Sequence, residues 1–518
     1  MKVAIIHNHL NRGGVTQVIS NHLRALQEQV PRGTRLSVGL LYGGRCDGWP
    51  RELAADLPQL DISFHTIDEL DYDNVRPHVG NLADELQTAL QQAGFGPQET
   101  VLHVHNHSLG KNIALPGALH SLALQGYATL LQIHDFAEDF RPDNYRQLAA
   151  AHGENTCDQL PGWLYPQAPQ LHYAVLNGRD HSILQDAGVD DARLHLLPNA
   201  VADIGPLPPR DEARARLADR CAIPIDHRFV LYPVRGIRRK NIGELLLWSA
   251  LADRQTSFAL TLAPLNPVEQ PSYGRWKKFA AAHDLPCVFE VGGPAGLAYT
   301  ENLAAADVIV TTSVAEGFGL VFLESWLAGR PLVGRDLPAI TADFVRAGIH
   351  FAGLQPQLWI PIGWLNEHVF RSTIADAYQD VLASYGQASP SPDALDRQVD
   401  ALVHDGLVDF GSCSVSMQRQ VIQRVADDSR DRDRLLEINP WIAEALTSGT
   451  ADTTLVEHNA RIVRSQYSLA SSGCRLLEIY QRVAGSDRDG ELQPLARGQR
   501  VLDNFLGLSR FHPLRVES

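Results

Sequence analysis

The sequence has few cysteines and no long hydrophobic run. Its six Cys, spread over 518 residues, include no C-x-x-C pair; they stand at positions 46, 157, 221, 287, 413 and 474. This spacing argues against a zinc ribbon or a disulfide scaffold and predicts reduced thiols. No segment approaches the roughly 18 apolar residues of a membrane span, and the start, MKVAIIHNHLNRGG, is too short in apolar residues for a secretion signal. We therefore expect a cytoplasmic protein without a membrane span.

Positive charge is in deficit, with 45 Lys and Arg against 60 Asp and Glu and a formal net charge of −15. Such a balance argues against a protein whose main task is to bind nucleic acid or an anionic membrane. Two catalytic signatures are missing as well. The sequence has no G-x-S-x-G motif and no Walker A motif, which disfavours a serine hydrolase and a P-loop ATPase.

Strand-like and helix-like segments alternate along most of the chain, which predicts parallel sheets covered by helices on both faces. A proline-rich stretch from Pro198 to Pro224 interrupts the alternation and is the best linker candidate. Buried strands are expected at 3–6, 36–41, 101–104, 130–133 and 173–176, and again at 229–232, 258–263, 288–291, 308–311 and 331–333. The pattern indicates two Rossmann-like, doubly wound α/β domains facing across a cleft, which is the natural ligand site.

The strongest local pattern is SVAEGFGLVFLE, residues 313–324, which follows the expected strand at 308–311 and leads into a helix. Gly317 and Gly319 allow a ligand to approach the backbone, and amides that open a helix donate to anions or sugar oxygens. Glu316 in the loop and Glu324 in the helix can accept hydrogen bonds from hydroxyl groups. The pattern indicates a ligand with a phosphate and many hydroxyls, the alternative being a surface loop before an ordinary helix.

A second pattern, RGIRRK at residues 235–240, follows the expected strand at 229–232. Four positive charges at the carboxyl end of a strand in an acidic protein indicate an anion pocket. A nucleotide diphosphate suits Arg235 and Lys240, since Arg binds two oxygens at once while Lys acts as a point charge. A solvated basic loop is the alternative and explains Arg238 and Arg239 well enough.

Glycines and histidines mark the strand ends of the first half. Gly13 and Gly14 separate the first strand from the first helix, where close approach of a ligand and a tight turn are equally consistent with the pair. His134 ends a later strand and is a candidate for contacting the substrate, the alternative being a hydrogen-bonded structural histidine.

His103, His105 and His107 alternate and share one side of an extended strand. We interpret them as a polar strand end that lines the cleft. A metal triad is the weaker interpretation because the sequence identifies no fourth ligand.

Together, these residues resemble the donor site of retaining GT-B glycosyltransferases, in particular glycosyltransferase family 4. The resemblance rests on Arg235 and Lys240 followed by the EGFG core in an E-x7-E spacing, which is specific. The opening with Gly13-Gly14, the segments QIHD at 132–135 and LPNAV at 197–201, and the helical region 463–483 are also similar. It covers most of residues 1–350 and about 455–485.

The resemblance implies a role for each matched residue. Arg235 and Lys240 would hold the donor diphosphate, Glu324 the ribose hydroxyls, and Glu316 the sugar ring. His134 would lie near the transferred sugar and Gly14, beside Gly13, near the diphosphate or the acceptor. The expected catalytic residues are Glu316, His134, Arg235 and Lys240. The expected donor-binding residues are Gly13, Gly14, Arg235, Lys240, Glu316, Gly317, Phe318, Gly319, Leu320 and Glu324.

The resemblance also implies a domain plan. We expect an acceptor-side domain at 1–204, completed by C-terminal helices at 485–518, and a donor domain at 205–484. The latter includes a helical elaboration at about 365–455 that has no counterpart in a minimal family member. Asn241 departs from the family, which usually has Gly after the Lys.

The expected activity is the retaining transfer of a hexose from UDP-glucose or GDP-mannose to a saccharide or small polar acceptor. The family needs no bound metal and no cofactor, because cationic side chains stabilise the leaving group. The alternatives are a GT-B-type sugar-nucleotide epimerase, a glycan phosphorylase, or a catalytically silent protein that binds a nucleotide sugar.

Overall fold

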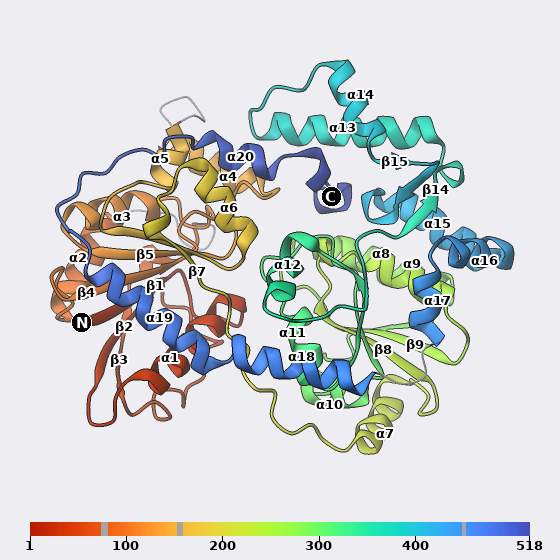
Figure 1. Cartoon of the computed structure of the whole chain (residues 1–518), viewed down its shortest axis with the longest axis horizontal. Helices are drawn as coiled ribbons and strands as arrows, with labels where there is room; N and C mark the ends of the chain where they lie inside the picture. The colour runs from red at the N-terminus through yellow and green to blue at the C-terminus, as the bar shows by residue number, and fades with distance from the viewer. Residues whose placement is uncertain (74–80, 153–158, 448–451, 518) are drawn as a thin grey trace. The chain divides into compact units, whose positions relative to one another are not determined.

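The computed structural model describes residues 1–73, 81–152, 159–447 and 452–517. These residues form two compact units, each built on a parallel sheet with helices packed against it (Figure 1). Unit 1 comprises Met1–Ala202, Ser384–Gln387 and Ser465–Gly507, and unit 2 comprises Asp203–Ala383, Ala388–Arg464 and Leu508–Ser518. The expected pair of doubly wound α/β domains is confirmed. Cys157 and residues 448–451 of the expected elaboration lie outside the described residues.

The sheet of unit 1 has seven strands in the order β3-β2-β1-β4-β5-β6-β7. Its strands are β1 (Lys2–His7), β2 (Leu36–Tyr42), β3 (Leu60–Thr66), β4 (Thr100–His105), β5 (Ala128–Ile133), β6 (Leu171–Val175) and β7 (Leu194–Leu196). The central strands β1, β4 and β5 are buried along almost their whole length, which explains their continuous apolar runs. The strand order reverses between β1 and β4, and ligands of such sheets bind at this switch point.

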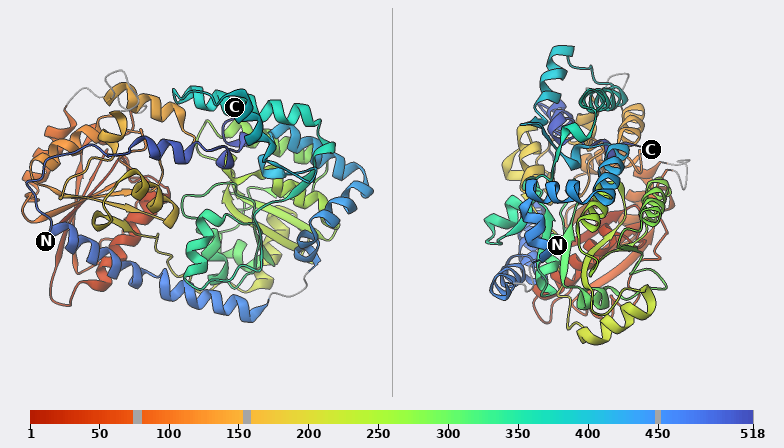
Figure 2. Two further views of the ribbon diagram at one scale, coloured as in Figure 1. Left: turned by 45° about the horizontal axis from the view of Figure 1, so that its top comes forward. Right: turned by 90° about the vertical axis from the view of Figure 1, so that its right-hand side faces the viewer.

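The helices of unit 1 come from both ends of the chain. They are α1 (Gly14–Gln29), α2 (Leu82–Gln92), α3 (Leu115–Leu124), α4 (Pro142–His152), α5 (Leu160–Leu164), α6 (Gly178–Ala187), α19 (Leu469–Ala484) and α20 (Gln499–Phe505). Helix α19 lies along α1 (Figures 1 and 2). Its side chains Leu476, Ile479 and Tyr480 join the same apolar core as Val3 and Val38 of β1 and β2. A helix from the far end of the sequence therefore completes the apolar core of the first sheet.

The main sheet of unit 2 repeats the plan with six strands in the order β10-β9-β8-β11-β12-β13. Its strands are β8 (Arg228–Arg235), β9 (Thr256–Leu262), β10 (Cys287–Phe289), β11 (Val308–Thr311), β12 (Leu332–Arg335) and β13 (Gly353–Gln355). The connecting helices are α7 (Arg210–Cys221), α8 (Ile242–Leu251), α9 (Gln270–Ala282), α10 (Tyr299–Ala305), α11 (Val321–Leu327) and α12 (Pro338–Arg346). Here the switch point lies between β8 and β11, the strands that precede the two charged motifs.

The expected elaboration is mostly helical but also contains a small antiparallel sheet. Its helices are α13 (Glu367–Ser384), α14 (Pro392–Asp400), α15 (Val415–Asp427), α16 (Ser429–Ile438) and α17 (Pro440–Thr447), and α18 (Thr453–Gln466) follows it. The sheet order is β14-β16-β15, from β14 (Trp359–Pro361), β15 (Val403–His404) and β16 (Leu407–Asp409). These strands have two or three residues each, too few to show a period in the sequence. Helix α15 packs on α8, so the elaboration supports the helix that follows the basic motif.

The chain changes units elsewhere than the sequence suggested. We expected residues up to 484 in the second domain and residues 485–518 in the first, but α19 belongs to unit 1 and residues 508–518 belong to unit 2. Helix α19 is held by its apolar face on α1. The last segment is held in unit 2 because Arg238 Nη1 donates to the carbonyl of Glu517 (2.8 Å) and the Val415 amide donates to Glu517 Oε2 (3.0 Å).

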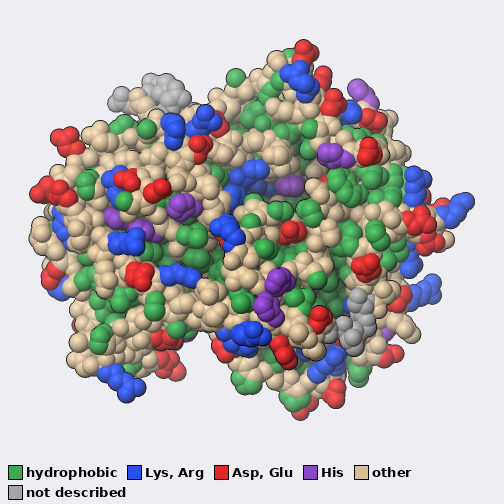
Figure 3. Space-filling view, viewed as in Figure 1, with side chains coloured by type: hydrophobic (Ala, Val, Ile, Leu, Met, Phe, Trp, Pro, Cys, Tyr) green, Lys and Arg blue, Asp and Glu red, His purple; other side chains and the backbone are tan. Residues whose placement is uncertain are grey.

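No helix among the described residues is long and apolar enough to cross a membrane. On the face shown in Figure 3, acidic and basic side chains are interspersed. The five cysteines of the described ranges are all free thiols, as expected.

Candidate active site

The two charged motifs of unit 2 lie at the carboxyl ends of adjacent strands. β8 pairs with β11 in parallel. The RGIRRK motif begins at the last residue of β8 and continues into the loop after it, and the EGFG motif lies in the loop after β11. Because β8 and β11 flank the switch point, their loops border the crevice in which doubly wound sheets bind ligands. The sheet therefore brings together two motifs that are some 76 residues apart in the chain.

Lys240 and Glu316 form an ion pair that joins the two loops. Ser313 Oγ donates to Glu316 Oε1 (2.6 Å), and the hydroxyl of Tyr232 lies 2.6 Å from Ser313 Oγ. Both charged side chains are nearly inaccessible, with side-chain exposures of 12% and 5%. Burial would raise the pKa of Glu316, but the positive charges of Lys240 and Arg239 outweigh it and lower that pKa. Burial lowers the pKa of Lys240, and Glu316 opposes this effect.

Backbone contacts fix the position of Lys240. Thr312 Oγ1 donates to the Lys240 carbonyl (2.9 Å), and the Val314 amide donates to the Arg239 carbonyl (3.0 Å). Two hydrogen bonds thus hold the loop after β8 against the loop after β11. A cation held in place by the backbone is suited to an anionic ligand, because little conformational entropy is lost on binding.

Asn241 follows Lys240 and adopts a left-handed backbone conformation, with φ 47° and ψ 61°. This geometry would suit Gly as well, since only Gly and, less readily, Asn visit that region at low cost. The side chain of Asn241 makes two hydrogen bonds. Its Nδ2 donates to Glu244 Oε2 (2.8 Å), and its Oδ1 accepts from Gln418 Nε2 of α15 (2.9 Å).

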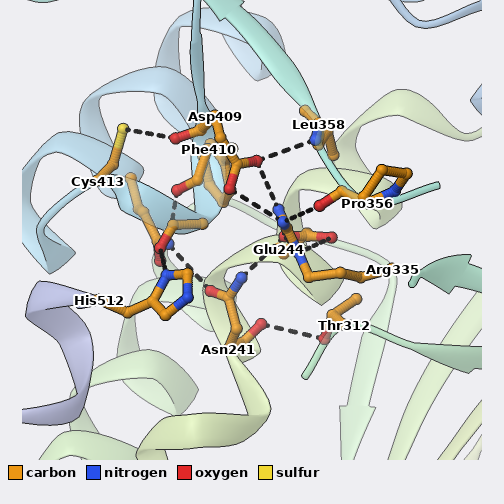
Figure 4. Close-up of polar contacts among 12 residues, drawn as sticks. Asn241, Glu244, Thr312, Arg335, Pro356, Leu358, Asp409, Phe410, Cys413 and His512 are labelled. Carbon is orange, nitrogen blue, oxygen red and sulfur yellow. Dashed lines mark hydrogen bonds and ion pairs between the residues drawn. The ribbon is translucent and has the colours of Figure 1, made fainter. Parts of the chain in front are cut away.

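A buried network extends from Asn241 into the elaboration (Figure 4). Arg335, at the end of β12, lies between two carboxylates, with Nη2 2.6 Å from Glu244 Oε2 and 2.8 Å from Asp409 Oδ1. Burial raises the pKa of Glu244 to about 7, although Arg335 opposes the shift. The network ties the ends of β12 and β16 and the first turn of α8 to Asn241, which directly follows the basic motif.

The three arginines of the basic motif each interact with a different part of unit 2. A register shift between Tyr232 and Arg235 interrupts the pairing of β8 with β9, and Arg235 Nη1 donates to the Ala263 carbonyl after β9 (2.7 Å). Arg238 binds Glu269, its amide donating to Oε2 at 2.8 Å. Arg239 contributes positive charge at Glu316, which the alternative of a solvated basic loop does not account for.

In the EGFG loop, Gly319 is the residue whose conformation requires glycine. Its φ is +84°, and a Cβ at this position would lie 2.6 Å from the Phe322 ring. Phe318 is buried and packs edge-on against Phe344, with the ring centroids 5.5 Å apart, so its side chain belongs to the core. Leu320 is 38% exposed and precedes α11.

Glu324, in α11, has a partner that the sequence did not reveal. The hydroxyl of Tyr299, at the start of α10, donates to Glu324 Oε2 (2.7 Å). Burial raises the pKa of Glu324, and the Tyr299 hydrogen bond partly opposes the shift. The carboxylate is therefore oriented by a neighbouring helix.

Gly13, Gly14 and His134 belong to unit 1. Gly13 has φ −174°, an extended conformation open to any residue, and a Cβ on Gly14 would meet nothing within 4 Å. No tight turn therefore requires glycine at either position. His134 is buried, its Nε2 lies 2.8 Å from His105 Nδ1, and burial lowers its pKa to about 4.

The three alternating histidines do not lie together. His103 and His105 have rings 4.3 Å apart, but His107 lies beyond the end of β4 and its Nε2 binds the Leu164 carbonyl (2.8 Å). The third ring beside the pair is His22 of α1, 5.4 Å from His103. The sequence did not predict that His22 lies here. A single histidine on an amphipathic helix has no second histidine at a fixed spacing in the same segment, so no motif marks it.

Comparisons with known proteins agree with this architecture. No family model matches the chain. The chain is 26% identical over 357 residues to mannosylglucosyl-3-phosphoglycerate synthase of Petrotoga mobilis, a match that spans 65% of this chain and 65% of that one.

Among solved structures, Anabaena HepE in complex with UDP and glucose gives a TM-score of 0.54 at 12% identity, covering 93% of this chain and 99% of the other. Sucrose-phosphate synthase from Thermosynechococcus elongatus gives 0.53 at 15% identity, with coverage of 93% and 99%. The resemblance noted in the sequence motifs is thus confirmed at the level of the fold, and the chain has the GT-B fold of glycosyltransferases.

Proposed function

We propose that the protein is a retaining glycosyltransferase that moves a hexose from a nucleotide sugar, UDP-glucose or GDP-mannose, to a saccharide or small polar acceptor. The observation that carries this proposal is the Lys240–Glu316 pair at the switch point of unit 2, with Arg239 adding positive charge. A buried cation at the carboxyl ends of β8 and β11 suits the diphosphate of such a donor.

The matched residues receive the following roles. Lys240 and Arg235 bind the diphosphate and stabilise the charge that develops on the leaving group. Glu316, held by Ser313, faces the sugar, and Glu324, held by Tyr299, accepts hydrogen bonds from the ribose hydroxyls. The backbone from Gly317 to Leu320 donates to the donor.

For unit 1 we propose that His134 contacts the transferred sugar. Gly13 and Gly14 allow the donor or the acceptor to approach the backbone. In this scheme no metal ion takes part in the transfer, because side-chain cations take its electrostatic role.

An acceptor with an anionic group is favoured by Lys111 of unit 1. This lysine follows the end of β4, its Nζ lies 5.9 Å from the centre of the Tyr72 ring, and burial together with the positive charge of Arg141 lowers its pKa. Among the described residues it forms no ion pair with a carboxylate. A phosphate or carboxylate on the acceptor would supply the missing charge, and the matched Petrotoga enzyme is named for a phosphoglycerate compound.

The donor is tested first by thermal unfolding with UDP, GDP and ADP, because a ligand that binds only the folded state raises the midpoint. The preferred nucleotide then identifies the sugar donors for an acceptor screen, in which release of nucleoside diphosphate must depend on the acceptor. The anomeric configuration of the product, read by NMR, tests retention.

The alternatives give different results in the same assays. An epimerase would change the sugar or release nucleoside diphosphate without a glycosylated product, and a phosphorylase would require inorganic phosphate. Tight nucleotide binding without turnover over the acceptor panel would identify a silent binding protein.

A further inference from the structure

Three histidines meet in the interior of unit 1, and one of them, His105, is hydrogen-bonded to His134. His103 and His105 lie on β4 and His22 lies on α1, and each is fully buried. One ring nitrogen from each of the three falls within 4.8 Å of the other two. Among the described residues, this is the single group of three or more His, Cys, Asp or Glu side chains with that geometry.

The secondary structure explains the convergence. Residues two apart on a strand point to the same face, so His103 and His105 both face the helix that covers β4. His22 reaches them from α1, with ring centroids 5.4 and 5.8 Å from those of His103 and His105. Two histidines on a strand and one on a helix present three imidazoles from a rigid frame.

Several of these ring nitrogens have no hydrogen-bond partner. Both nitrogens of His22 and Nε2 of His105 are buried and unsatisfied. An unsatisfied buried polar group typically costs about 1–3 kcal/mol, and a cluster of such groups calls for an explanation. A neutral imidazole carries the lone pair that a metal ion requires.

The outer contacts orient the two strand histidines. His103 Nε2 lies 2.9 Å from Gln132 Oε1, an acceptor, which places the ring proton on Nε2 and a lone pair on Nδ1. His105 Nδ1 lies 2.8 Å from His134 Nε2, which leaves His105 Nε2 toward the cluster. Histidine ligands of metal ions generally donate their second ring N–H to a carbonyl or a comparable acceptor in this manner.

We propose that His22, His103 and His105 form a binding site for one divalent transition metal ion of the Zn²⁺ type inside unit 1. Imidazole nitrogens bind Zn²⁺ at about 2.0–2.1 Å, so the rings must close by a small rotation, which His22 can make because no hydrogen bond restrains it. The hydroxyl of Tyr480 is hydrogen-bonded to His103 Nδ1 (2.7 Å), so it must release that lone pair when the ion binds and then lies beside the site as a candidate fourth ligand. The ion would join α1, β4 and α19, and it would lie one hydrogen bond away from His134.

The test uses the full-length protein, treated with a chelator and dialysed. Bound metal is measured by mass spectrometry after addition of Zn²⁺, and coordination is measured by the visible absorption of added Co²⁺, which is intense only in tetrahedral sites. We expect one ion per chain. His22→Gln should weaken binding about 100-fold or more while circular dichroism stays native, because this substitution breaks no hydrogen bond of the native structure.

Two controls keep the result specific. His107→Gln alters the neighbouring histidine that binds the Leu164 carbonyl, and His195→Gln alters a histidine paired with His172 at 2.8 Å. Both variants should bind the ion as the wild type does. The proposal is overturned if the wild type takes up no ion, if His22→Gln binds it unchanged, or if either control variant loses it. Since no readout depends on glycosyl transfer, failure here leaves the proposed function untouched.

Discussion

The side-chain amide of Gln418 donates to the side-chain oxygen of Asn241, across 177 positions of sequence (2.9 Å). One residue belongs to the elaboration and the other follows the lysine assigned to the donor diphosphate. Helix α15 of the elaboration is therefore part of the support of the basic loop. The same contact compensates for the absence of glycine at position 241, because the side chain that causes the strain is also the one that is anchored.

Replacing Asn241 separates backbone strain from lost hydrogen bonds. Asn241→Gly loses the contacts to Glu244 and Gln418 but suits φ 47°, whereas Asn241→Ala loses the same contacts and keeps the strain. We expect the alanine variant to be less stable than the glycine variant by about 1–2 kcal/mol, as measured by urea unfolding. Equal stability of the two variants would show that the left-handed conformation is not costly here.

Arg335 should be among the most sensitive positions of unit 2. It is 3% exposed and lies between Glu244 and Asp409. Arg335→Met would leave two buried carboxylates without their cation, and breaking a buried pair in this way costs about 3–5 kcal/mol. The loss should be smaller in Arg335→Met/Glu244→Gln, since one of the stranded charges is gone. A double variant as unstable as the single one would exclude charge as the cause.

Loss of Lys240 should affect catalysis far more than loss of an exposed lysine. Removing a charge-assisted contact to the leaving group lowers kcat by about 100- to 1,000-fold, and we expect this for Lys240→Ala and for Glu324→Ala. The control is Lys277→Ala, whose ammonium is paired with Glu290 at 3.0 Å on a half-exposed side chain. Steady-state rates with the identified donor measure the effect. Near-normal turnover of either active-site variant would contradict the assigned roles.

Lys240→Ala also strands Glu316 in a buried position, so its stability has to be measured beside its rate. Lys240→Met/Glu316→Gln removes both charges and serves as the folding control. If this double variant unfolds like the wild type yet remains inactive, the loss of rate is due to chemistry and not to unfolding.

Lys111 should determine affinity for the acceptor and leave the donor unaffected. If the acceptor carries a phosphate or a carboxylate, Lys111→Met should raise its KM about 10-fold or more, since hydrogen bonds to charged groups contribute about 1.5–3 kcal/mol. The affinity for the nucleotide, read from thermal shifts, should not change. The effect should disappear with an uncharged analogue of the acceptor, and an equal loss with both acceptors would contradict an anionic subsite at Lys111.

Much of the fold could be predicted because both main sheets are parallel and buried. Runs such as VAII in β1 and VIVT in β11 are apolar on both faces and stand out from their surroundings. The edge strand β3 was missed because one face is open and its sequence, LDISFHT, alternates apolar and polar residues. The short strands β7, β13 and β14 contain three residues each, which is too few for a pattern.

The candidate site could be predicted as two loops but not as a set of contacts. The motifs identified Lys240 and Glu316, whereas nothing in the sequence showed that they pair or that Tyr232 and Ser313 complete the chain of hydrogen bonds. Tyr299 was missed for the same reason, since it reaches Glu324 from the helix before β11. Such partners depend on the packing of helices on the sheet, which leaves no fixed spacing in the chain.

Because of Glu138 in unit 1, we expect the free energy of unfolding to fall as the pH rises. It is 1% exposed, its carboxylate accepts from the Tyr165 hydroxyl (3.0 Å), and burial raises its pKa from the usual 4.5 to about 7. Between pH 4.5 and pH 7 the unfolded chain carries this carboxylate ionised while the folded protein keeps it protonated. Ionisation therefore favours the unfolded state, and the contribution of Glu138 to stability falls as pH rises through this window, by about 3 kcal/mol in total.

Glu138→Gln removes the titration but keeps an acceptor for Tyr165. The free energy of unfolding of the variant and of the wild type is measured in urea at pH 5 and pH 8. The difference, variant minus wild type, should be larger at pH 8 than at pH 5 by up to about 3 kcal/mol. Glu28→Gln, at an exposed position on α1, should follow the wild type at both pH values. Parallel curves for the wild type and Glu138→Gln would mean that the Glu138 carboxyl is ionised in the folded protein across the whole range, because only a group that binds its proton differently in the two states can change the slope.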